Sequence, residues 1–288
     1  MSLFKRMKRN ARLFWMFFKR NVLGHYSYIE WFLPFDILNL IVGIASWYFY
    51  GLTFGGRSPL LEPYGGDFVA FLILGVAFNT LFSFALTSVY AVVVNMYQAQ
   101  ISYGGVRVTM ADYLALAKIP WSVYAASYLF WEGLMNVITF VAYFFAGLYL
   151  FGMSINPNAN YLGGFIALIL GFVSMLGISM FSASMVWLMG AWHGVEPINW
   201  IVTLLAGLVS GVYFPPDVLP DVLRIASNYL PQTYTLKAIR LALLGGYGNT
   251  QLLPYFSILT VYVIVLIPSG AFLLKYSFKV ARRKATLM

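Results

Sequence analysis

The chain has 288 residues, of which 61% are hydrophobic and only 9% are charged, against about 25% charged in ordinary soluble proteins. This composition excludes a soluble globular protein and predicts an all-α polytopic membrane protein with one transmembrane domain over 1–288. The net charge of +9 gathers near the two ends, which argues against a nucleic-acid partner, and the absence of cysteine excludes disulfides and thiol chemistry.

Residues 2–23 predict a basic amphipathic helix. Apolar residues recur at steps of three and four, while most of the basic residues lie off that stripe. Such a helix is expected to lie on the membrane, with its charges toward anionic lipid headgroups. The alternative is a solvated basic helix that binds a soluble acidic partner.

Six apolar segments are predicted to cross the membrane as helices: 31–54, 68–95, 122–151, 161–190, 199–214 and 254–275. The amino end, the 96–120 loop and the carboxyl tail are rich in Lys and Arg. The opposite side holds only Arg57, Arg224, Lys237 and Arg240. The positive-inside tendency therefore predicts a cell-membrane protein with both termini in the cytoplasm.

Residues 215–246 are predicted to form an external re-entrant helical hairpin. Pro215 and Pro216 end the preceding helix, and two short helices follow at about 220–230 and 235–244, the second ending at Gly245-Gly246. At 1.5 Å per residue, each reaches roughly half of the ~30 Å hydrocarbon core. Such a hairpin is stable only where protein or a cavity covers its backbone.

The 96–120 loop contains a short helix predicted at 109–118. Thr109 and Asp112 fit a capping box, and Pro120 ends the helix. A capped helix between two long spans suits a docking element that faces the cytoplasm. The alternative is a helix that lies on the lipid surface and closes the loop.

Asp36 and Glu132 are acids predicted to lie within spans, where a charge costs at least ~2.5–3.5 kcal/mol. They are candidates for a proton relay or a contact to a polar substrate group. The alternative is a packing role in which each carboxyl pairs with Asn39, Asn136 or a nearby Lys. With two histidines and no clustered ligands, no metal site is expected, and the chain has no phosphate loop for ATP.

Small residues form stripes along several predicted spans, most densely in the fourth, at Gly171, Ser174, Gly177, Ser182 and Ser184. They permit close helix approach. Packing within the chain and packing between two copies are both compatible with them.

The arrangement resembles the type-2 permease family of ATP-binding-cassette transporters. The most specific part is Gly211-Val212-Tyr213-Phe214-Pro215, followed by Leu219-Pro220, Leu230-Pro231, Tyr234 and Ala238-Ile239-Arg240. The resemblance implies a non-enzymatic permease subunit that pairs as a homodimer, or with a similar permease, and binds two separate ATPase subunits. ATP and Mg would be bound by those partners, with no cofactor in this chain. The cargo would be a lipid, a lipid-linked glycan, a drug or another amphipathic compound.

By position, the resemblance assigns two sets of residues. Coupling to the ATPase would involve Thr109, Asp112, Tyr113, Leu114 and Lys118, and an external gate would involve Phe214, Pro215, Pro216, Pro231 and Tyr234. The loop shows Tyr103-Gly104-Gly105-Val106 where the family often has an acidic-Arg-Gly-Thr run. The principal alternative function is an ion-coupled secondary transporter that uses Asp36 and Glu132. An intramembrane enzyme ranks last, because no nucleophile–base pair is present.

Overall fold

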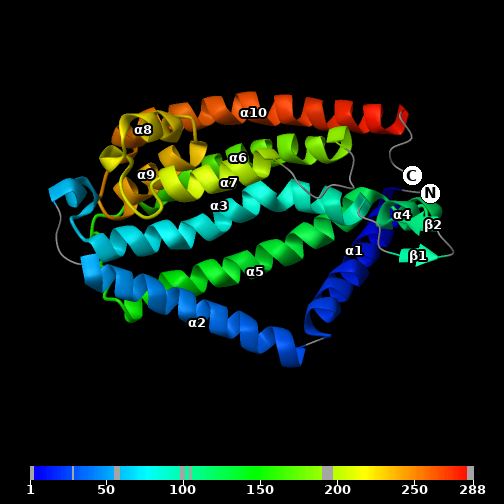
Figure 1. The fold of residues 1–288 in the computed structure, drawn as a ribbon, viewed down its shortest axis with the longest axis horizontal. Coiled ribbons are helices and arrows are strands. Elements are labelled where there is room, and N and C mark those ends of the chain that lie inside the picture. Colours follow the sequence, from blue (N-terminus) through cyan, green and yellow to red (C-terminus); the bar gives the residue numbers. More distant parts are fainter. Residues whose placement is uncertain are drawn as a thin grey trace.

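The computed structural model describes residues 3–27, 29–54, 59–97, 101–103, 106–189 and 197–283. Nearly all of them are helical (Figure 1). The elements are α1 Leu3–Tyr26, α2 Ile29–Phe54, η1 Pro59–Tyr64, α3 Phe68–Tyr97, β1 Ile101–Tyr103, β2 Val106–Val108, α4 Met110–Leu116, α5 Trp121–Tyr149, α6 Tyr161–Met189, α7 Pro197–Val209, η3 Pro216–Val218, α8 Asp221–Asn228, α9 Pro231–Leu243 and α10 Asn249–Arg283.

Four helices in the described part of the chain are long and apolar enough to cross a membrane. They lie in α3, α5, α6 and α10, at Phe68–Tyr97, Trp121–Tyr149, Tyr161–Leu188 and Asn249–Val280. This is the architecture of an all-α membrane protein. Helix α10 has 35 residues and therefore extends beyond both ends of the expected span 254–275.

Helices α2 and α7 are the two shorter candidates. The described apolar run within α2 is Ile37–Trp47. Helix α7 has 13 residues, about 20 Å at 1.5 Å per residue, and ends at Val209 rather than at 214 as expected. The chain leaves the helical path at Ser210, and Gly211 takes a φ of +85°, a conformation that glycine adopts readily. That α2 and α7 cross the membrane stays a prediction.

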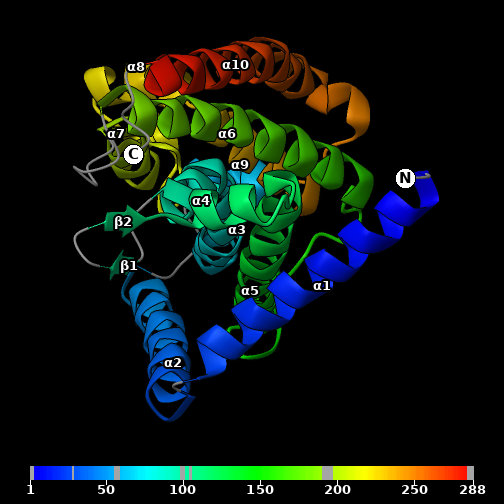
Figure 2. The same cartoon turned by 90° about the vertical axis from the view of Figure 1, so that its right-hand side faces the viewer.

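Helix α3 lies at the centre of the bundle. It packs against α5 on one side and α6 on the other, and α10 runs along the outer side of α6 (Figures 1 and 2). All residues from Ala70 to Phe78 in α3 are buried. Figure 1 places α4, β1 and β2 at one end of the molecule, here called the α4 end, and η1, α8 and α9 at the opposite end, the hairpin end.

Glycines allow α6 to approach its neighbours closely. A Cβ on Gly177 would lie 2.6 Å from Leu266 Cβ in α10, and a Cβ on Gly270 would lie 2.8 Å from the carbonyl oxygen of Gly177. A side chain at Gly171 would collide with Thr235 of α9. At these positions the small residues serve packing within the chain, one of the two roles that the sequence left open.

Helix α1 crosses the α4 end of the bundle and covers 3–26, slightly more than the expected 2–23 (Figure 2). Phe14 and Phe18 pack edge-on against Phe130 of α5, with ring centroids 5.8 and 5.5 Å apart. The basic residues of the opposite face are exposed: Lys5, Lys8, Arg9, Arg12 and Lys19. The helix is therefore amphipathic as predicted, and part of its apolar face is covered by α5.

Candidate functional site

The segment 215–246 folds as two short helices, α8 and α9, which we call the hairpin. Helix α8 matches the first expected helix, whereas α9 begins at Pro231 rather than at Thr235. Proline suits this first position, because its φ is already helical and its missing N–H is not needed there. Helix α9 is followed by Gly245 and Gly246 as predicted, and Gly246 takes a φ of +70°.

The carboxyl end of α9 is capped by the loop between α5 and α6. The backbone N–H groups of Asn156 and Asn160 donate to the carbonyl oxygens of Leu243 and Ala242, at 3.1 and 2.8 Å. Asn160 Nδ2 also donates to the carbonyl oxygen of Tyr247 at 3.1 Å. These bonds use carbonyls that a helix end would otherwise leave unpaired, and they fasten the hairpin to the bundle.

Arg240 of α9 is buried, with 2% of its surface exposed. Its Nε and Nη2 donate to the carbonyl oxygen of Phe71 in α3, at 3.1 and 2.9 Å. Nη2 also donates to the carbonyl oxygen of Val212 at 2.8 Å, and Nη1 donates to that of Gly211. We call these four residues the Arg240 latch, because one side chain joins α9, α3 and the segment that follows α7.

The charge of Arg240 is stabilised without a counter-ion. Among the residues that the structure describes, no carboxylate pairs with it, and the guanidinium lies 3.5 Å from the centroid of the Phe71 ring. Burial lowers the pKa of Arg240 to about 9, and the nearby Tyr64 partly opposes this shift, so the group stays protonated at neutral pH. Backbone carbonyl dipoles and the aromatic face therefore replace a carboxylate partner.

The Arg240 latch requires a glycine in α3. A Cβ on Gly75 would lie well inside contact distance of both Arg240 Nη2 and the carbonyl oxygen of Val212. Only a residue without a side chain lets these two groups reach the surface of α3 here.

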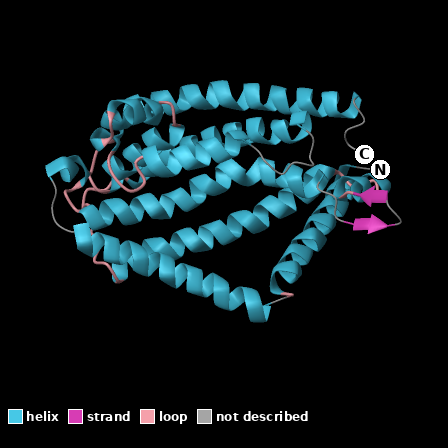
Figure 3. Ribbon diagram, in the orientation of Figure 1, coloured by secondary structure: helices cyan, strands magenta, loops and turns pink. Residues whose placement is uncertain are grey.

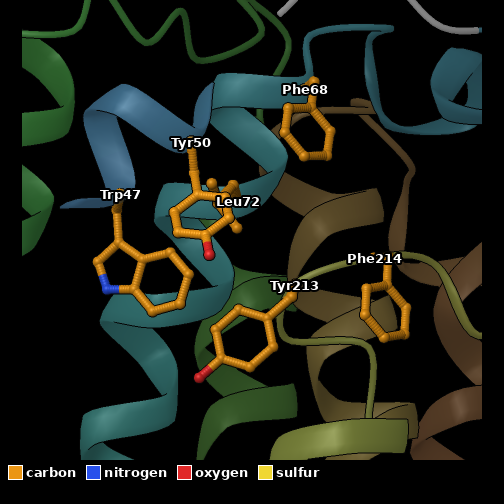
Figure 4. Close-up of a pocket in the computed structure, with 6 residues that line it drawn as sticks. All are labelled: Trp47, Tyr50, Phe68, Leu72, Tyr213 and Phe214. Atoms are coloured by element: carbon orange, nitrogen blue, oxygen red, sulfur yellow. The ribbon is translucent and has the colours of Figure 1, made fainter. Parts of the chain in front are cut away.

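An aromatic cavity of about 450 Å³ lies beside the latch, between α2, the start of α3 and the segment after α7. Its lining residues are Trp47, Tyr50, Phe68, Leu72, Tyr213 and Phe214 (Figure 4). Trp47 and Tyr213 are stacked, with ring centroids 4.7 Å apart and planes inclined by 19°. The described lining carries no charged side chain, so the cavity suits an apolar or aromatic group.

The expected gate residues lie in two different settings. Phe214 lines the aromatic cavity, and Pro215 beside it is buried while Pro216 is half-buried. Pro231 is buried at the start of α9, and Tyr234 Oη donates to the carbonyl oxygen of Asn228 at 3.0 Å, which ties α9 to α8. The last two therefore shape the hairpin rather than the cavity. Of the residues that line the cavity, only Phe214 was predicted as a site residue. The chain has many aromatic residues, and the sequence does not show which of them come together in the fold.

Helix α4 follows the antiparallel strands β1 and β2 (Figure 3). The predicted capping box is confirmed: Asp112 N–H donates to Thr109 Oγ1 at 3.2 Å, and Thr109 N–H donates to Asp112 Oδ2 at 2.7 Å. The helix ends at Leu116, before the expected 118, and Lys118 has a φ of +51°.

The side chains of α4 divide into an inner and an outer set. Leu114, expected to contact a partner, is instead buried against the bundle beside Val92 and Tyr124. Tyr113 is 44% exposed and Leu116 is 80% exposed. Leu116 lies two residues after Leu114 and therefore points to a different side of the helix, away from the bundle. Leu116 was not among the residues predicted to contact a partner.

The two acids expected within spans do not form a described pair. Asp36 belongs to α2, but its side chain lies outside the described residues. Glu132 is half-buried in α5, and Asn136 Nδ2 donates to its backbone carbonyl oxygen at 2.9 Å rather than to its carboxylate.

Within the described ranges, no group of three or more His, Cys, Asp or Glu side chains is placed to hold a metal ion. No protein-family model matches the chain, and no curated protein matches it.

Proposed function

We propose that this chain is the permease subunit of an ATP-binding-cassette exporter. It moves an amphipathic cargo outward through six membrane spans, while a pair of separate ATPase subunits hydrolyses ATP. The spans are α2, α3, α5, α6, α7 and α10, both termini are cytoplasmic, and two copies pair across the pathway, as a homodimer or with a similar permease. The hairpin lies on the external side as a re-entrant element.

Helix α4 is the observation that carries this proposal. It is capped and stands at the end of the bundle opposite the hairpin (Figure 1). Its outer side presents Tyr113 and Leu116, and its inner side fixes Leu114 against α3 and α5. An exposed apolar side chain on a firmly seated short helix suits a protein partner, and any displacement of α4 reaches α3 through Leu114.

The aromatic cavity supports an amphipathic cargo. It lies at the hairpin end, bordered by Phe214, and its described walls are aromatic rings and one leucine. Such walls bind an apolar portion of a ligand, while the polar portion stays outside the cavity. Closure of the ATPase pair would push α4, and the resulting movement would open a path beside this cavity.

The test is purification of the tagged full-length chain from its native membranes. The proposal predicts that a protein with a G-x-x-x-x-G-K-[ST] phosphate loop copurifies in equal amount and that the complex hydrolyses ATP. Leu116→Asp should abolish this association, because it places a charge in the apolar contact. Val222→Asp is the matched control, since Val222 is 78% exposed on α8 at the opposite end.

Two results would overturn the proposal. One is a functional chain that never retains an ATPase. The other is transport that continues without ATP and disappears in the Asp36→Asn, Glu132→Gln double variant, which would favour the ion-coupled alternative.

A further inference from the structure

Helix α3 has two side-chain hydroxyls that bond back to their own helix within residues 83–90. Thr87 Oγ1 donates to the carbonyl oxygen of Ser83 at 2.9 Å, and Ser88 Oγ donates to that of Ala85 at 3.0 Å. In a regular α-helix these carbonyls receive the backbone N–H four residues later. Hydroxyl groups that bond back to their own helix compete with that ladder and often bend the helix.

A contact from α6 reaches the backbone of the same stretch. Ser179 Oγ accepts hydrogen bonds from the backbone N–H groups of Val89 and Tyr90 in α3, at 3.0 and 3.4 Å. Val89 is also the residue whose N–H lies opposite the Ala85 carbonyl in a regular helix, and that carbonyl accepts the hydroxyl of Ser88 as well. Insertion of a side chain into the ladder is a known cause of helix bending. Helix α3 contains no proline to explain its bend, which is visible in Figure 1.

Ser179 is held on a firm support. It is fully buried, with 0% of its surface exposed. Two residues before it, Gly177 lies against Leu266 of α10, and the Gly177 carbonyl meets Gly270 so closely that neither glycine has room for a side chain. The position of the Ser179 oxygen is therefore set by the packed pair α6 and α10.

The half of α3 toward the hairpin end is fixed by α9. Phe71 accepts two hydrogen bonds from Arg240, and Asn79 Oδ1 accepts one from Gln232 Nε2 at 2.7 Å. This half is therefore anchored to the hairpin.

The half toward the α4 end has other partners. Asn95 Nδ2 donates to Tyr128 Oη of α5 at 3.0 Å, and Val92 and Met96 pack with Leu114 of α4. This half is therefore anchored to α4 and α5, and residues 83–90 are the stretch between two differently anchored halves.

We infer that residues 83–90 of α3 form a hinge whose fixed point is Ser179 Oγ. Ser179 is a positioning residue: it accepts hydrogen bonds from the amides of Val89 and Tyr90 while the α4 half of the helix turns relative to the hairpin half. The hinge is inferred from this set of hydrogen bonds. Its role in carrying movement from an ATPase to the hairpin rests on the proposed function.

The hinge can be tested by pulsed EPR on the full chain in nanodiscs. Because the chain has no cysteine, spin labels at Leu60→Cys and Ala117→Cys are the only labels. Leu60 lies in η1 at the hairpin end and Ala117 caps α4, so the pair reports the distance between the two elements that lie at either end of α3. Ser179→Ala should shift the label-to-label distance distribution, because Val89 and Tyr90 lose their acceptor. Ser179→Thr, which keeps a hydroxyl, should restore it.

Ser174→Ala is the matched control. Ser174 is also fully buried in α6, but its Oγ donates to the carbonyl oxygen of Leu170 in the same helix at 2.7 Å. A distribution unchanged by Ser179→Ala, or changed equally by Ser174→Ala, would overturn the hinge. A Thr variant that behaves like the Ala variant would assign the effect to packing and would also overturn it.

A second measurement separates the hinge from the proposed function. If an ATPase copurifies, Ser179→Ala should keep it bound while transport per ATP hydrolysed falls, and unchanged coupling would count against the hinge as a transmitter. If no ATPase copurifies, the proposed function fails, whereas the EPR distances still decide whether the hinge exists.

Discussion

Replacing Arg240 by methionine tests the Arg240 latch. The change leaves the carbonyl oxygens of Gly211 and Val212 without a donor among the described residues. Each buried unpaired carbonyl costs about 1–3 kcal/mol, and the lost contact between the guanidinium and the Phe71 ring adds about 1–2 kcal/mol. Removal of a buried charge offsets part of this loss, so we expect a net destabilisation of about 3 kcal/mol.

This free energy corresponds to an apparent Tm lower by roughly 6–12 °C, measured by thermal unfolding of the purified protein in detergent. Arg240→Lys should lose about half as much, because one ammonium group cannot reach three carbonyls. Arg224→Met is the matched control: Arg224 is half-exposed on α8 and pairs with the exposed Asp221, a pair worth at most about 0.5 kcal/mol. An apparent Tm of Arg240→Met equal to that of the control would refute the reasoning.

Three further predictions concern the same elements. Gly75→Ala should lower the apparent Tm by several degrees, because its methyl group would displace the guanidinium, whereas Gly207→Ala, which meets nothing within 4 Å, should not. Thr109→Ala should cost α4 about 1 kcal/mol, seen as faster hydrogen exchange of its amides, and unchanged exchange would contradict the role of the cap. Trp47→Ala should weaken binding of a hydrophobic fluorescent probe to the aromatic cavity, whereas Trp15→Ala, an exposed residue of α1, should leave it unchanged. Equal loss in both tryptophan variants would show that the probe binds elsewhere.

Local signals in the sequence were enough to predict several of these elements. The Thr109–Asp112 capping box depends on residues three apart, and the stop at Gly245-Gly246 depends on the backbone freedom of glycine. The long helices α3, α5, α6 and α10 follow from apolar runs that exceed the length of a span.

Features that depend on distant partners were not predicted. Arg240 was counted as one of the few charges on the external side, because no pattern in the sequence shows that three carbonyls will surround it. Its position in the apolar run Ala238–Leu243 was the only local sign. Leu114 was wrongly assigned to a partner surface, because only its packing against α3 shows which side of α4 faces the bundle. The aromatic cavity joins segments that are far apart in the sequence, and no short motif shows that they come together.

The Arg240 latch can form only late in synthesis of the chain. Arg240 and its acceptor Phe71 are 169 residues apart, so at ~5–20 residues per second the ribosome needs roughly 10–30 s to supply the guanidinium after Phe71 emerges. During this interval the surface of α3 around Gly75 lacks the contact that Arg240 makes in the folded protein. Substitutions in the latch should therefore reduce the amount of protein that reaches the membrane more than they impair the molecules that mature.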